Sequence, residues 1–185
     1  TLDSVGQEPT VTTRVEVPPK PPTVEEVAVK KSFVITKGNL KSIVENLIKE
    51  TELVGVKSRQ GKYIYDKITN FGELRLDYEV TMATPTKYFL PAKETLLKFK
   101  LGNESKIAPV AETTPRVIIG MHPYDIKAIE LLDEVFIDTN PDPNYIARRQ
   151  NTTIIGVDCL NPSPNSFAPS MGTHLTKSGF DLLLT

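Results

Sequence analysis

The stretches Arg116-Val117-Ile118-Ile119-Gly120 and Thr153-Ile154-Ile155-Gly156-Val157 decide the fold. Each is a short apolar run rich in β-branched residues, which indicates a buried strand. From Asp125 onward, apolar residues between the two runs keep helical spacing: Ile126, Ile129, Leu132, Val135 and Phe136. A strand, a helix and a second strand make a βαβ unit, whose two strands are parallel neighbours with a right-handed crossover. We therefore expect an α/β domain with a mixed sheet, strands near 116–120 and 153–157, and flanking helices.

The residues around this unit predict further elements. Apolar residues at helical spacing predict an amphipathic helix over 39–51. Strand-like runs occupy 33–35, 53–56, 63–65 and 180–185, and a turn is expected around Gln60-Gly61. Short helices are expected at 93–98 and 142–149, and residues 96–99 could instead continue into a strand. Residues 85–91 read as a loop with buried aromatic side chains.

The N-terminal residues 1–31 differ from the rest of the chain. They contain Pro9, Pro18, Pro19, Pro21 and Pro22 and lack the apolar residues of a core. Two interpretations stay open: a flexible tail, or an extended arm in a polyproline conformation that lies against its own domain or a partner. The folded domain is expected to comprise residues 32–185. Because the strand pattern stops at Thr185 without a turn, we expect more protein to follow.

Composition limits the classes of function. The formal net charge of −1 provides no basic field, so a nucleic-acid partner is not expected. No apolar run approaches the roughly 20 residues that cross a bilayer, so direct membrane insertion is not expected. The single cysteine, Cys159, excludes an intrachain disulfide and fits a reducing, cytoplasmic location.

Two loops should carry any chemistry, because ligands of open α/β sheets gather at the carboxyl ends of parallel strands. These loops are Met121–Asp125 and Asp158–Gly172. A catalytic pair of Cys159 and His122 is one interpretation. The other is a buried, inert cysteine and a histidine in a local hydrogen bond. A single sulfur is too little for an iron–sulfur cluster, which normally takes four thiolates.

A pair of arginines, Arg148-Arg149, lies beyond these loops. With Asp138 and Asp142 nearby in the sequence, it could bind an anion. The favoured interpretation is that these arginines anchor a loop through salt bridges.

Several segments together resemble a family of anaerobic redox subunits. Residues 119–133 (Ile-Gly-Met-His-Pro-Tyr-Asp-Ile-Lys-Ala-Ile-Glu-Leu-Leu-Asp) are similar to the family segment G-[VM]-R-P-C-D-x-x-A-I-x-x-L-D. Residues 142–149 are similar to D-P-Y-Y-x-x-R-R, and residues 89–97 contain a form of P-x-K-E-x-L. The resemblance continues through 155–159, 170–172 and 179–182. The family is that of the 4Fe-4S dicluster proteins, which includes the beta subunit of Ni/Fe sulfhydrogenases and the A subunit of anaerobic sulfite reductase.

The resemblance implies where a cluster corner would lie. Family members place cysteines in the two loops. Carried over by position, these fall on Tyr124 and Cys159 and near Ser163, Ser166 and Ala168, and only Cys159 keeps its sulfur. Asp125 and Ser166 could supply oxygen ligands, although such ligation would be unusual. We expect the corner to be degenerate, with Tyr124 filling the space close to Cys159 and mostly buried.

The implied function is an electron-transfer or scaffolding subunit of an anaerobic iron–sulfur oxidoreductase complex, such as a hydrogenase or a sulfur-compound reductase. No cofactor is expected in residues 1–185. The 4Fe-4S clusters are expected in a following ferredoxin-like domain or in partners, which would be other subunits of the complex. The alternatives are a non-redox module that holds a complex together, and an enzyme with Cys159 as its nucleophile.

Overall fold

A five-stranded mixed sheet forms the centre of the domain. The computed structural model describes residues 32–100, 106–110 and 114–185. The strands run in the order β2-β1-β5-β6-β7, and their bounds are β1 Glu52–Arg59, β2 Lys62–Lys67, β5 Arg116–Met121, β6 Thr152–Val157 and β7 Leu182–Leu184. The β1–β2 pair is antiparallel, and the pairs β1–β5, β5–β6 and β6–β7 are parallel. The predicted α/β class with a mixed sheet is confirmed.

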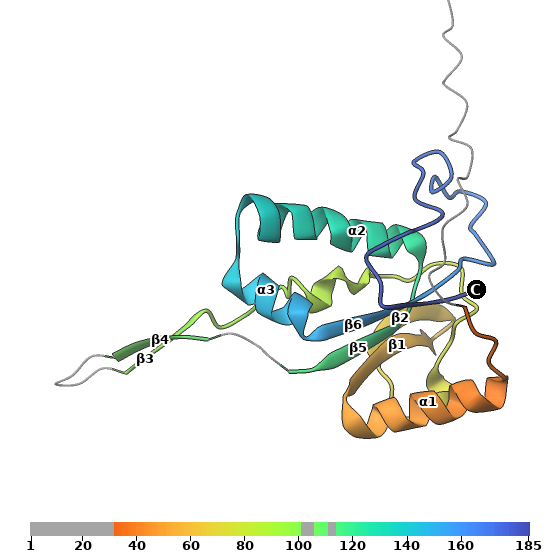
Figure 1. The fold of residues 1–185 in the computed structure, drawn as a ribbon, viewed down its shortest axis with the longest axis horizontal. Coiled ribbons are helices and arrows are strands. Elements are labelled where there is room, and N and C mark those ends of the chain that lie inside the picture. Colours follow the sequence, from red (N-terminus) through yellow and green to blue (C-terminus); the bar gives the residue numbers. More distant parts are fainter. Residues whose placement is uncertain (1–31, 101–105, 111–113) are drawn as a thin grey trace, which may run out of the picture.

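The βαβ unit is present as the sequence predicts. Strands β5 and β6 are parallel neighbours, with Ile118 opposite Ile154. The crossover contains α2 (Pro123–Asp133), which continues into a π-helical segment (η3, Glu134–Thr139), and then α3 (Pro143–Gln150). Figure 1 shows α2 and α3 together on one side of the sheet. This crossover brings the ends of β5 and β6 to the same edge.

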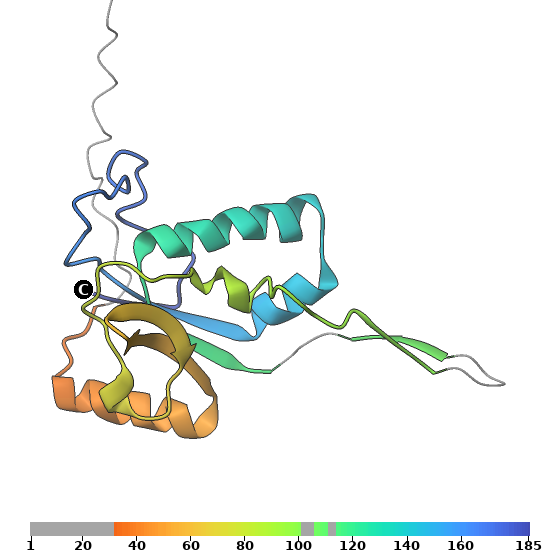
Figure 2. The ribbon, with the colours of Figure 1, turned by 180° about the vertical axis from the view of Figure 1, so that it is seen from behind.

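Helix α1 (Lys37–Glu50) covers the opposite face of the sheet, as both views show (Figures 1 and 2). It begins slightly before the predicted residue 39, because the hydroxyl of Thr36 accepts a hydrogen bond from the Asn39 amide at 3.2 Å and caps the helix. Its Val44 is fully buried. The short 3-10 helices η1 (Phe71–Glu73) and η2 (Pro85–Tyr88) lie in the segment that leaves β2.

Alternate strand residues enter two separate apolar cores. On the α2 and α3 side, Val54, Ile118 and Ile154 pack with residues of these helices, including Ile126, Ile129 and Tyr145. On the α1 side, Leu53, Val117, Ile119 and Ile155 pack around Val44. Successive side chains of a strand point to opposite faces, so near-continuous apolar strands require cover on both sides. This explains why the apolar runs at 116–120 and 153–157 carry no polar alternation.

A two-stranded hairpin, β3 (Leu97–Lys100) and β4 (Lys106–Pro109), projects from the domain (Figures 1 and 2). It forms a separate antiparallel sheet, with Phe99 opposite Ile107. The predicted helix over 93–98 is wrong, because residues 93–96 are irregular and residue 97 already belongs to β3. The alternative strand over 96–99 is the better prediction.

The predicted strand over 33–35 is also wrong. These residues precede α1 without regular structure, and the side chain of Val34 is fully exposed. The interpretations of the arm fall on residues 1–31, which lie outside the described residues. Among the helices described, none is both long enough and apolar enough to cross a bilayer.

Candidate functional site

A bulge at the end of β5 shapes the corner where the sequence predicts a site. The pairing of β5 with β6 shifts between Ile119 and Met121, and Gly120 between them has a φ of +90°. A backbone in this region favours glycine, because a side chain there is strained. The carbonyl of Gly120 accepts hydrogen bonds from the hydroxyls of Tyr78, at 2.7 Å, and Tyr65, at 3.3 Å. The bulge thus gives two buried phenols a common acceptor.

The two tyrosines extend this contact into a buried chain of hydrogen bonds. The hydroxyls of Tyr65 and Tyr78 are 2.9 Å apart. The Tyr65 hydroxyl shares its one proton between the Gly120 carbonyl and Oδ2 of Asp125, which lies at 3.2 Å. Burial is the main cause that raises the pKa of both phenols well above the usual value, and the Asp125 carboxylate raises them further. Both tyrosines are therefore neutral donors at physiological pH.

Asp125 is the acidic end of this chain. It lies in the first turn of α2, and only 5% of its surface is exposed. Burial raises the pKa of its carboxyl from 3.8 to about 6, while the hydrogen bond from Tyr65 opposes the shift. The predicted site residue Asp125 is thus a buried carboxyl committed to a tyrosine.

His122 and Tyr124 form the other side of the corner. Nδ1 of His122 and the hydroxyl of Tyr124 share a hydrogen bond of 2.6 Å, as predicted for a histidine in a local contact. The imidazole stacks on the Tyr78 ring at a centroid distance of 4.0 Å and is 1% exposed. Burial lowers the pKa of His122 to about 4, so the ring is neutral at physiological pH. Its Nε2 has no hydrogen-bond partner among the described residues.

Cys159 lies beside this cluster at the end of β6. In the thiolate form its charge would raise the pKa of the Tyr78 and Tyr124 phenols. Close packing of Tyr124 against Cys159 stays a prediction. Tyr124 is partly rather than fully buried. Burial raises the pKa of the Cys159 thiol, and a backbone hydrogen bond from Asn161 only partly opposes this. A catalytic cysteine needs the opposite shift, so the corner does not activate this thiol.

The predicted serines lie further along the loop that follows β6. Ser163 accepts a hydrogen bond from the Asn165 amide at 3.4 Å, and Ser166 accepts one from the Ala168 amide at 3.3 Å. Both side-chain oxygens therefore cap turns of their own loop, which rises beyond the sheet edge in Figure 1. Tyr124 and Asp125 lie in the first turn of α2, which follows β5, and Cys159 follows the neighbouring strand β6, whereas the serines have separate local roles.

The side chains at this corner do not fit a 4Fe-4S cluster. Such a cluster normally takes four thiolates, whereas the corner has one protonated thiol. The Tyr124 hydroxyl is bonded to His122, and the Asp125 carboxyl is bonded to Tyr65. Within residues 32–100, 106–110 and 114–185, no group of three or more His, Cys, Asp or Glu side chains is arranged to hold a metal ion.

The sequence did not predict the roles of three side chains at the corner: the hydrogen bonds of Tyr65 and Tyr78, and the stacking of His122 on Tyr78. Tyr65 and Tyr78 come from β2 and an irregular segment, and their contacts with Gly120 span 55 and 42 residues. No motif or spacing marks them. The stacking of His122 on Tyr78 equally depends on the folded chain.

Both arginines of the predicted pair form salt bridges. Arg149 contacts Asp133 at 3.0 Å, and Arg148 contacts Glu94 at 2.5 Å. The favoured interpretation of these arginines as anchors is confirmed. Asp142, which lies near the pair in the sequence, instead caps α3 by accepting a hydrogen bond from the Asn144 amide at 2.8 Å.

The fold and the corner define an α/β domain with helices on both faces of a mostly parallel sheet, whose carboxyl-end corner is occupied by its own tyrosines, histidine and carboxylate. Over 140 residues the chain is 32% identical to Sulfhydrogenase 2 subunit beta of Pyrococcus furiosus. The chain therefore belongs to a sulfhydrogenase beta-subunit-like family, which confirms the family resemblance. The match comprises 75% of this chain and 41% of that subunit, so the chain spans less than half of its relative. No family model matches the chain, and no solved structure matches it.

Proposed function

We propose that this domain belongs to an electron-transfer subunit of a cytoplasmic, anaerobic, hydrogenase-like complex, and that it acts there as a scaffold. The identity to Sulfhydrogenase 2 subunit beta carries the proposal. That relative is by name a subunit of a sulfhydrogenase, so the partners of this chain would be the other subunits of such a complex.

The corner at the ends of β5 and β6 is the reason to assign the domain a scaffolding role and not a cluster of its own. Cys159, Tyr124, Asp125, Ser163 and Ser166 correspond to a cluster corner that has lost its ligands. Electrons would therefore pass through 4Fe-4S clusters outside residues 1–185, in a following domain or in partner subunits. The buried hydrogen bonds that link Asp125, Tyr65, Tyr78 and the Gly120 carbonyl make the domain rigid at the place where a cluster would otherwise lie.

Anaerobic affinity purification of the tagged full-length protein from its native cells tests the proposal. We expect it to co-purify in fixed stoichiometry with iron–sulfur and hydrogenase-type subunits, in a complex that reduces a viologen dye with hydrogen. A protein recovered without any redox subunit would contradict the proposal.

The alternative is a module that only holds the complex together, and the occupied corner favours it. A strain in which residues 32–185 are deleted from the gene separates the two functions. Loss of electron transfer to the physiological acceptor, with the remaining subunits still associated, supports a domain that positions the clusters of an electron-transfer subunit. Dissociation of the complex, with dye reduction retained by the isolated catalytic subunit, supports the assembly role.

A further inference from the structure

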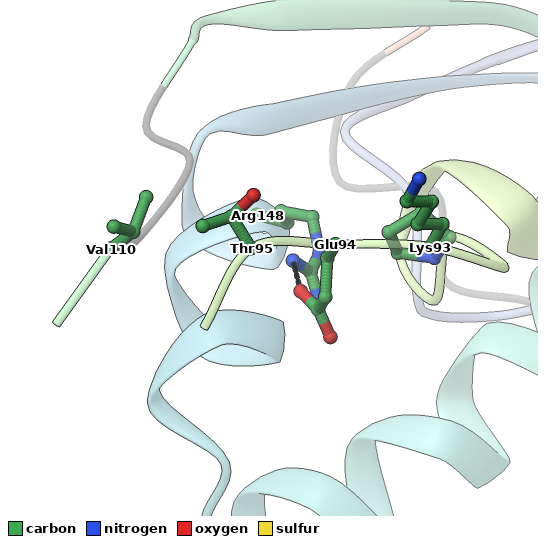
Figure 3. A pocket seen from close by; sticks show the side chains of 6 residues that line it. Lys93, Glu94, Thr95, Val110 and Arg148 are labelled. Atoms are coloured by element: carbon green, nitrogen blue, oxygen red, sulfur yellow. Dashed lines mark hydrogen bonds and ion pairs between the residues drawn. The ribbon is translucent and has the colours of Figure 1, made fainter. Parts of the chain in front are cut away.

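A cavity lies at the root of the projecting hairpin, away from the corner described above. Its volume is about 330 Å³, and its lining residues come from the segment before β3, the residue after β4, and α3: Pro91, Lys93, Glu94, Thr95, Val110 and Arg148. Figure 3 shows the guanidinium of Arg148 against the carboxylate of Glu94 in this cavity. The cavity thus lies where the hairpin meets the rest of the domain.

Among the described residues, one donor of the Arg148 guanidinium has no acceptor. Its side chain is 3% exposed, its Nε donates to the Phe89 carbonyl at 2.7 Å, and its Nη1 bonds to Glu94. Its Nη2 is buried and has no hydrogen-bond partner in the described part of the chain. A buried charged donor without an acceptor costs free energy, so an incoming acceptor is favoured at this place.

The charges of the cavity select the kind of acceptor. Arg148 and Lys93 bring two positive charges and Glu94 brings one negative charge, which leaves one positive charge in excess. A carboxylate compensates this charge and can bond to a guanidinium, whose planar donors suit it. Residues 93–95 are irregular and exposed, so a small displacement of this segment can open the covered Nη2.

The hairpin beside the cavity presents apolar side chains to solvent. Leu97 is 56% exposed and Phe99 is 70% exposed, and the two lie on one face of β3 because they are two residues apart. The hydrogen bond from the Val110 amide to the Leu96 carbonyl, at 3.0 Å, extends the ladder to the cavity. Among the residues the structure describes, neither strand pairs with a third. Isolated two-stranded hairpins are marginally stable in water, so this hairpin gains stability when another protein segment packs against its exposed apolar side chains.

We propose that the hairpin and its root cavity form a docking surface for another subunit of the complex, whose contacting segment presents an Asp or Glu side chain beside apolar residues. The carboxylate binds Arg148 and Lys93, and the apolar residues cover Leu97 and Phe99. This choice of partner rests on the proposed function. The docking surface itself rests on the unused donor, the charge of the cavity and the exposed apolar face.

Photo-crosslinking in the native complex tests this surface. The full-length protein carries p-benzoylphenylalanine in place of Phe99 or Thr95, or in place of Leu131 on α2 as the control. We expect cross-links from the first two positions to one segment of another subunit that contains an acidic residue next to apolar ones. The exposed Leu131, on a different part of the surface, should give none to that segment.

Charge and polarity variants provide the second measurement. In co-expression with the wild-type protein, Lys93→Glu and Phe99→Asp should each lower incorporation into the complex about tenfold, as substitutions at the centre of an interface do. The matched control Lys49→Glu, on α1 at the opposite face of the sheet, should leave incorporation unchanged. Circular dichroism should show the same folded content in all three variants, because all three residues are exposed.

Several results would overturn the docking surface alone. These are a complex without cross-links from Phe99 and Thr95, cross-links between two copies of this protein, and cross-links to its own residues 1–31. Equal incorporation of Lys93→Glu and Lys49→Glu would do so as well. Absence of every redox subunit from the wild-type preparation would instead contradict the proposed function and, with it, this choice of partner.

Discussion

Replacing Asp125 by Asn should change how the stability of the domain depends on pH. Asn keeps the size of the side chain and an oxygen that can accept the hydrogen bond from Tyr65. It removes the ionisable carboxyl, whose pKa burial raises to about 6. In the unfolded chain an Asp carboxyl has a pKa of about 3.9. Between these two values the folded protein binds more protons at Asp125 than the unfolded chain does.

This difference fixes the sign and the size of the effect. Stability that depends on the protonated Asp125 is fully present below the unfolded pKa and is lost as the pH rises through about 6. A shift of about two pKa units corresponds to about 3 kcal/mol, of which most is lost between pH 4 and pH 7. The Asn variant lacks this loss. Its free energy of unfolding, minus that of the wild type, should therefore become about 2 to 3 kcal/mol more positive over this range.

Urea unfolding followed by circular dichroism at several pH values between 4 and 7, at constant ionic strength, measures this difference. The comparison across pH cancels any constant cost of the new amide group. Asp138→Asn, at an exposed residue of η3, is the matched control and should show no comparable trend. A difference between Asp125→Asn and wild type that stays constant with pH would refute the burial of an ionisable carboxyl at this corner.

Three further predictions concern the same corner. His122→Phe should show the opposite trend. The folded pKa of His122 is about 4, so the wild type gains stability as the pH rises from 4 to about 6.5. The variant-minus-wild-type difference in unfolding free energy should then fall by about 3 kcal/mol between pH 4 and pH 7, and a flat difference would contradict it. Gly120→Ala should lower the urea-derived stability by about 1 to 3 kcal/mol, because it forces a side chain into a left-handed backbone 3.1 Å from Leu76. The control Gly172→Ala, also at positive φ but with open space around it, should cost less, and equal costs would argue against the contact with Leu76. Cys159 should react more slowly with iodoacetamide at pH 7 in the folded protein than in urea, because burial raises its thiol pKa; faster labelling in the folded state would support the nucleophile instead.

The sequence predicts the central part of the fold because the signals there are local and agree with one another. The apolar runs of β5 and β6 and the helical spacing between them require a parallel pair covered on both faces. The predicted strand over 33–35 failed because β propensity alone does not create a partner strand. Those residues instead lead into α1, which Thr36 caps.

The corner could be predicted only in outline. The positions of Tyr124, Asp125 and Cys159 follow from topology, since the ends of neighbouring parallel strands meet at one edge. The roles of Tyr65 and Tyr78 do not follow from topology. Both hydroxyls donate to the Gly120 carbonyl, and the direction of this carbonyl is set by the bulge between β5 and β6. The hairpin was missed as a unit for a related reason. Its described apolar side chains Leu97 and Phe99 are exposed and belong to no core, so the pattern around 93–99 fits helix and strand equally.

Iron and sulfide analysis of the isolated chain tests the central claim, that this corner holds no cluster. The chain would be incubated anaerobically with ferrous iron and sulfide, desalted, and analysed for bound iron, acid-labile sulfide and ultraviolet–visible absorbance. We predict iron at background level and no broad absorbance that dithionite bleaches, because the Tyr124 hydroxyl is hydrogen-bonded to His122, the Asp125 carboxyl is hydrogen-bonded to Tyr65, and the single thiol is protonated. About four irons per chain with a reducible absorbance would contradict the account.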